Sequence, residues 1–184
     1  MHPVVGPEGL DSLEKQGTLV GILIAQQLEQ TVLKWIFRSW PQLHQDSGMN
    51  WHIAIPCEAN PERQGHPGIH EFNFSLSDQL REMYGIDLAE GPVLVLDDFR
   101  DETRQLYLKI SRSEEERVDM FNSMTTFING YVRDPKYRGH NDRGRHQLIS
   151  ALFNHMQRRR ILHTFIKSAP NAASGALRML RVPL

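Results

Sequence analysis

The chain contains almost no cysteine: Cys57 is the only one among 184 residues. A single thiol excludes an internal disulfide and is typical of proteins in a reducing compartment. Cys57 comes at the end of an expected strand, away from any clear electropositive cluster, so we expect an inert, structural thiol rather than a reactive one.

Long hydrophobic runs are also missing. No apolar segment approaches the roughly 20 residues that a membrane-spanning helix needs. The first nine residues lack the basic start and apolar middle of a signal peptide. We therefore expect no membrane partner and a cytoplasmic location.

Acidic residues are scarce in only one part of the chain. Residues 1–132 hold 10 Lys/Arg and 20 Asp/Glu, a net charge of −10, whereas residues 133–184 hold 11 Lys/Arg and 2 Asp, a net charge of +9. The overall charge of −1 therefore hides two oppositely charged parts. Such a split indicates either different tasks or mutual neutralisation.

The first half of the chain alternates between strand-like and helix-like patterns. Residues 18–24 and 51–55 are apolar runs of the length of a buried strand. Between them a helix is predicted from about Gln26, kinked or stopped at Pro41. Its apolar positions recur every three or four residues and should form one inner face: Leu28, Val32, Leu33, Ile36, Phe37 and Trp40.

The next segments have clear signals for where helices and strands begin and end. A short helix should end at Gly85, where glycine supplies a left-handed terminus. Residues 93–96 predict a third buried strand, and 105–110 alternate in period 2 like a half-exposed edge strand. Ser113 and three glutamates then predict the capped start of a helix to about Val132. Its expected inner face comprises Val118, Phe121, Met124, Thr125, Ile128 and Tyr131.

The predicted order is strand, helix, strand, helix, strand, strand, helix. This βαβαββα order resembles the thioredoxin fold, as do Tyr84-Gly85-Ile86 and the segment Gly91-Pro92-Val93-Leu94-Val95-Leu96 before a hairpin. The resemblance implies a cis-proline at Pro92. It places a thioredoxin-like α/β domain at residues 17–133, between a leader at 1–16 and a basic helical extension and tail at 134–184.

The chain differs from the thioredoxin family at the position of that family's redox motif. The resemblance implies a Cys-x-x-Cys motif near residues 25–28, where this chain has Ala25-Gln26-Gln27-Leu28. The residue before the expected cis-proline is Gly91 instead of a β-branched one. We therefore expect the fold without thiol-disulfide activity, and with no catalytic residue and no cofactor.

The C-terminal part carries the basic charge. A helix is predicted over residues 145–167, but its two apolar stripes do not share one face of a straight helix. Either the helix breaks near residues 157–160, or it is apolar on two sides and packs against two surfaces. The candidate residues for binding nucleic acid or a partner are Arg143, Arg145, Arg158, Arg159 and Arg160.

Three functional hypotheses follow. The first is a protein-interaction or assembly module that binds an extended peptide of another protein or a second copy, at Gly91, Pro92 and Val93, the residues that the resemblance implies. The alternative is an accessory protein that binds nucleic acid through the basic helix. The third is an enzyme with an unrecognised site in the loop at 56–72. His66 and His70 lie in that loop, where we expect no metal site.

Overall fold

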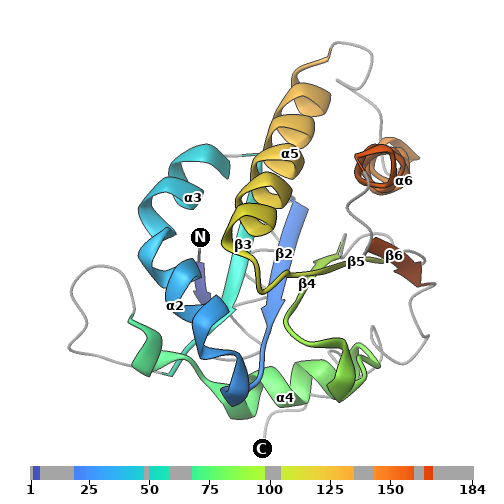
Figure 1. Cartoon of the computed structure of the whole chain (residues 1–184). Helices are drawn as coiled ribbons and strands as arrows, with labels where there is room; N and C mark the ends of the chain where they lie inside the picture. Colours follow the sequence, from blue (N-terminus) through green and yellow to red (C-terminus); the bar gives the residue numbers. More distant parts are fainter. Residues whose placement is uncertain are drawn as a thin grey trace, which may run out of the picture.

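A computed structural model describes residues 2–4, 19–47, 50–58, 68–97, 105–134, 143–159 and 164–167. Of residues 2–4, 97, 143–147 and 164–167 it describes the backbone. Within these ranges the chain is a mixed α/β structure in which one sheet is covered by helices (Figure 1).

The sheet has the strand order β1-β3-β2-β4-β5-β6. β2 lies parallel to β3, which lies parallel to β1, whereas β4 is antiparallel to β2, β5 to β4 and β6 to β5. The strands are β1 (His2–Val4), β2 (Leu19–Ile24), β3 (Trp51–Pro56), β4 (Val93–Asp97), β5 (Gln105–Lys109) and β6 (Thr164–Lys167). β2 and β4 are central, so both of their faces are buried.

Helices and short 3-10 turns connect the strands. The α-helices are α2 (Gln30–Arg38), α3 (Trp40–Ser47), α4 (Phe74–Met83), α5 (Glu114–Arg133) and α6 (Arg143–Arg158). The 3-10 turns are η1 (Gln27–Glu29), η2 (Ile69–Glu71) and η3 (Leu88–Glu90). In the described part of the chain no helix is both long and apolar enough to cross a bilayer.

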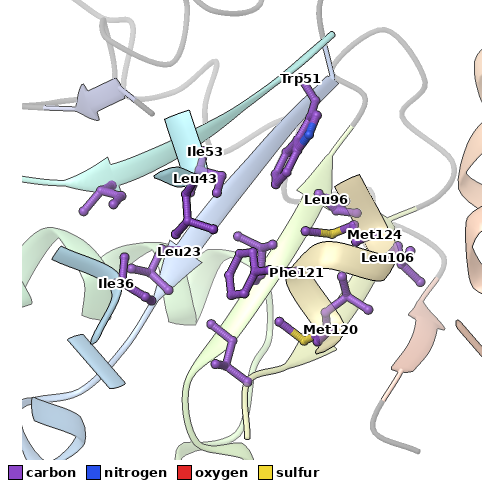
Figure 2. Close-up of a cluster of buried hydrophobic side chains, with 14 of the residues drawn as sticks. Leu23, Ile36, Leu43, Trp51, Ile53, Leu96, Leu106, Met120, Phe121 and Met124 are labelled. Carbon is purple, nitrogen blue, oxygen red and sulfur yellow. The ribbon is translucent and has the colours of Figure 1, made fainter. Parts of the chain in front are cut away.

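The larger core lies between the sheet and the helices α2, α3, α5 and α6. Alternate residues of each strand face it, such as Leu23 of β2 and Leu106 of β5. Figure 2 shows Phe121, Met120 and Met124 of α5 directed at these strands, with Ile36 and Leu43 next to Leu23. Burial of this apolar surface is the main stabilising term for the arrangement.

The opposite face of the sheet is covered by α4. Val20, Ile22 and Ile24 of β2 point to this side, and Leu76 and Leu80 of α4 pack on them. The continuous apolar runs in β2 and β4 follow from this arrangement, because helices cover both faces of these strands.

The predicted helix ends are confirmed. Ser113 accepts a hydrogen bond from the Glu116 amide at 3.5 Å and begins α5. Gly85 has φ +59° and follows α4, and its amide donates to the Glu82 carbonyl at 3.0 Å. At the start of α4 the cap is Asn73, whose side chain accepts a hydrogen bond from the Leu76 amide at 2.9 Å.

Two residues predicted to face inward are exposed. Leu28 lies in η1, one turn before α2 begins, and is 93% exposed. Val118 of α5 is 40% exposed, so the inner face of that helix was predicted too wide. The long first helix is also divided: α2 ends at Arg38, and Pro41 lies in the first turn of α3, where its missing amide costs no helical hydrogen bond.

The predictions for both sheet edges were wrong. β5 was expected to be a half-exposed edge strand, but it lies between β4 and β6 and is largely buried. The helix predicted over residues 145–167 ends at Arg158, which confirms the alternative of a break near residues 157–160. Residues 164–167 form β6, which was not predicted. Residues 2–4, which lie within the predicted leader, form β1. A period-2 or helical pattern does not show which distant segment of the chain will pair with a given strand.

Candidate functional site

The junction between β2 and α2 lies at one end of the sheet and is fastened to α4. Ser77 of α4 is fully buried; its hydroxyl donates to the Ala25 carbonyl at 2.9 Å, and the Ala25 amide donates back to Ser77 Oγ at 3.0 Å. Both backbone groups of the residue after β2 are thus satisfied by one side chain.

The turn η1 carries the chain from this point into α2. Glu29 Oε2 accepts the Gln26 amide at 2.8 Å, and the Glu29 amide donates to the Gln26 carbonyl at 3.0 Å. These two bonds close the turn around Glu29, which is only 8% exposed. The turn leaves Leu28 directed away from the core, which explains its exposure.

A second loop lies beside this turn. Gln26 Nε2 donates to the Leu88 carbonyl of η3 at 3.3 Å. The buried Arg81 of α4 supports the same loop from within: Nη1 donates to the Asp87 carbonyl at 3.1 Å and Nη2 to the Gly91 carbonyl at 3.4 Å. Arg81 is 2% exposed, so its charge is held inside the protein.

Charged groups gather around the buried carboxyl of Glu29. Burial raises its pKa, although Arg81, Arg112 and Lys109 each act to lower it. Arg81 is buried and Lys109 half-buried, while Arg112 is exposed. Within residues 25–29 there is no thiol, hydroxyl or imidazole, so this junction offers a fixed surface and one acid rather than a nucleophile.

The three predicted peptide-binding residues border this site but differ in access. Val93 is fully buried in β4, where it pairs with Ile24 on one side and Lys109 on the other. The Pro92 carbonyl accepts the Ile110 amide at 2.8 Å. Gly91 is only half-buried and is therefore the member of the three that a ligand can reach. No peptide bond of the described residues is cis, so the cis-proline implied by the resemblance is not present.

Gly91 has a conformation that favours glycine, with φ +76° and ψ −159°. A Cβ at this position would lie 3.3 Å from Glu29 Oε1. We expect Gly91→Ala to lower the free energy of unfolding by about 1–3 kcal/mol, from backbone strain together with displacement of Glu29. Urea denaturation would measure the loss, with Gly130→Ala as control because no atom lies within 4 Å of a Cβ there. Equal stabilities of the two variants would contradict the strain.

The predicted basic residues lie at several kinds of position. Arg143 and Arg145 are in the first turn of α6, where the structure describes the backbone, and Arg160 lies outside the described residues. Arg158 and Arg159 end the helix and are exposed. The opposite side of α6 is buried in the core through Leu148, Ile149, Leu152 and Met156. This burial agrees with the packing of the helix on the acidic part of the chain.

A groove between α5 and α6 was missed by the sequence analysis. Ser123 Oγ and His155 Nε2 lie 3.0 Å apart across it. The His155 ring also stacks on Phe127, with 4.6 Å between ring centroids and 30° between planes. The signal was a second stripe on α5, at residues 119, 122, 123, 126, 127 and 130, whose spacing of three and four places them on one face.

The stability of this interface should depend on pH. Burial, followed by Arg159 and Arg158, lowers the pKa of His155 from its ordinary 6.5. The unfolded chain therefore binds the proton more readily, so stability should fall as the pH drops below about 6.5 and level off below the folded-state pKa. Urea midpoints between pH 7.5 and 5 would show this loss, which should be smaller in His155→Gln. The comparison with the variant is needed because burial also lowers the pKa of His52, which would add its own pH dependence. Parallel pH curves for the original chain and His155→Gln would contradict the role of His155.

The remaining candidate residues that the structure describes lie apart from both of these sites. Cys57 is fully buried. His70 is exposed and His66 lies outside the described residues. Among the residues that the structure describes, no group of three His, Cys, Asp or Glu side chains is placed to hold a metal ion.

Comparisons with protein-family models, curated proteins and solved structures find no match for this chain.

Proposed function

We propose that this protein is a non-catalytic, thioredoxin-like interaction module that binds an extended segment of another protein at the β2–α2 junction. The order β2, α2–α3, β3, α4, β4, β5, α5 follows the βαβαββα order of the resemblance and supports this proposal. The trans bond before Pro92 is a departure from it. The proposed binding surface is therefore the junction itself.

The observation that carries the proposal is a pair of exposed leucines on two fastened loops. Leu28 is 93% exposed and Leu88 is 69% exposed, the two most exposed large apolar side chains among the described residues. Their loops are joined by the bond from Gln26 to the Leu88 carbonyl. Exposed apolar side chains gathered at one place mark an interaction surface more often than single ones do.

The two loops that carry these leucines are fixed by hydrogen bonds within the chain itself. Glu29 closes one loop and Arg81 supports the other, so little chain entropy would be lost on binding. Gly91, which lacks a side chain, lets a peptide backbone approach the end of β4 closely. These features fit a segment that is extended and supplies apolar side chains at alternate positions.

Selection from a random peptide library displayed on phage would test this function. We expect enrichment of peptides with alternating apolar residues, and a labelled enriched peptide should lose about tenfold or more in affinity with Leu28→Ser and Leu88→Ser combined. Both side chains are exposed, so the double variant should fold with a stability change within about 0.5 kcal/mol. Val118→Ser, on exposed α5 surface, is the matched control. Absence of enrichment, or equal affinity of the double variant, would overturn the proposal.

A second candidate function is binding of nucleic acid through α6. Its support is the exposure of Arg158 and Arg159 at the end of a helix whose other side is anchored in the core. Anisotropy of labelled RNA and DNA at about 50 mM and about 200 mM salt would test it, because several phosphate contacts should cost orders of magnitude over that range. The full chain is required, since removing α6 would expose core residues. Binding that is insensitive to salt or to Arg158→Ala with Arg159→Ala would exclude this role.

A further inference from the structure

The groove between α5 and α6 has the size of a small-molecule site, with a cavity of about 790 Å³. α5 is two-faced: Phe121, Met124 and Ile128 enter the core, whereas the stripe at 119, 122, 123, 126, 127 and 130 lines the groove. From α6 the lining side chains are Ala151, Asn154, His155, Arg158 and Arg159. Both helices therefore turn a mixed aromatic and polar face toward the cavity.

The groove contains a continuous aromatic surface. Phe127 lies between His155, at 4.6 Å, and Tyr131, at 5.9 Å, with ring planes inclined by 30° and 33°. The lowered pKa of His155 keeps its imidazole neutral near pH 7. Its bond to Ser123 holds the ring in one orientation. Flat rings held in this way are suited to stacking on a planar ligand.

Charged groups of both signs line the same cavity. Arg158 and Arg159 follow His155 by three and four residues, so they continue its face of α6. Asp119 is on the facing stripe of α5. Guanidinium groups favour phosphate, and a carboxylate accepts hydrogen bonds from hydroxyl groups.

We propose that this groove binds a nucleoside monophosphate. The base lies against Phe127 and its aromatic neighbours, the ribose hydroxyls donate to Asp119, and the phosphate pairs with Arg158 and Arg159. Asn122 and Asn154 supply amide donors and acceptors at the lining for the edge of the base. The site is separate from the β2–α2 junction and does not depend on the function proposed there.

Hydrolysis by the Ser123–His155 pair is the competing interpretation, and the backbone argues against it. Both residues lie inside α-helices, at residues 114–133 and 143–158. Helical amides there are engaged in hydrogen bonds along the helix, so they cannot form an oxyanion hole beside Ser123. The pair is better explained as the support of the aromatic surface.

Isothermal titration calorimetry of the full chain with AMP, adenosine and ribose 5-phosphate would test the proposal. We expect saturable AMP binding, and weaker binding of ribose 5-phosphate by about tenfold because it lacks the base. Arg158→Ala with Arg159→Ala should weaken AMP by about tenfold or more and leave adenosine unchanged. These arginines are exposed, so their replacement should not affect folding.

Two further variants complete the test. Phe127→Leu should weaken AMP and adenosine alike by about fivefold, because it removes the ring and keeps an apolar side chain. Arg38→Ala removes an exposed arginine that pairs with Glu114 and should bind AMP as the original chain does. Absence of saturation at about 5 mM AMP, equal AMP affinity of the double arginine variant, or equal affinity for ribose 5-phosphate and AMP would each overturn the proposal.

Discussion

Phe121→Ala is expected to lower the free energy of unfolding by about 3–5 kcal/mol, enough to remove much of the stability of a domain of this size. Phe121 is 2% exposed and lies where α5 meets the sheet, 5.5 Å from the ring of Trp35 of α2. Figure 2 shows it surrounded by the side chains of the larger core. The alanine would leave a cavity between three elements that cannot all collapse onto it.

Urea denaturation followed by circular dichroism would measure this loss. Val118→Ala is the matched control, since it removes an apolar side chain from the same helix at a position that is 40% exposed. Its effect should stay within about 0.5 kcal/mol. A loss below about 1.5 kcal/mol for Phe121→Ala would mean that α5 does not pack on the sheet through this residue.

Arg81→Met is expected to lower the free energy of unfolding by about 2–4 kcal/mol. The methionine keeps much of the apolar length of the side chain but removes both donors to the η3 loop. The carbonyls of Asp87 and Gly91 would lose these bonds. Glu29, whose carboxyl is buried, would also lose the cation that most favours its charged form.

Arg38→Met is the control for this variant. Arg38 donates to Glu114 at 2.8 Å, but the two side chains are 68% and 60% exposed, so the pair should contribute less than about 1 kcal/mol. Glu29→Gln should recover part of the loss when it is combined with Arg81→Met, because the buried negative charge is then absent. Purely additive effects of the two substitutions would contradict a coupling between Glu29 and Arg81.

Local signals predicted much of the element order. The apolar runs of β2, β3 and β4, the cap at Ser113 and the left-handed Gly85 are short-range features, and the structure confirms them. What failed depends on distant segments. β6 pairs with β5 across more than 50 residues, and β1 pairs with β3 in the same non-local way. A segment of four residues carries no pattern that identifies such a partner.

The candidate sites were predicted less well than the fold. Leu28 fits the apolar spacing of α2, and only the bond of Glu29 to the Gln26 amide shows why it lies outside that helix. In the sequence, nothing distinguishes Arg81 from an ordinary helical arginine. Only its bonds to the carbonyls of Asp87 and Gly91 show its role. The groove between α5 and α6 needed the position of α6, because the stripe on α5 resembles a solvent-exposed polar face when it is taken alone.

The paired hydrogen bonds of Ser77 and Ala25 link two elements that share no backbone pairing. The Ala25 amide is protected by a side chain of α4, so its exchange with deuterium requires α4 to separate from the end of β2. Amides within β2 are protected by the sheet and report its opening instead. The exchange rate at Ala25 is therefore a local measure of how often the junction comes apart while the sheet stays intact.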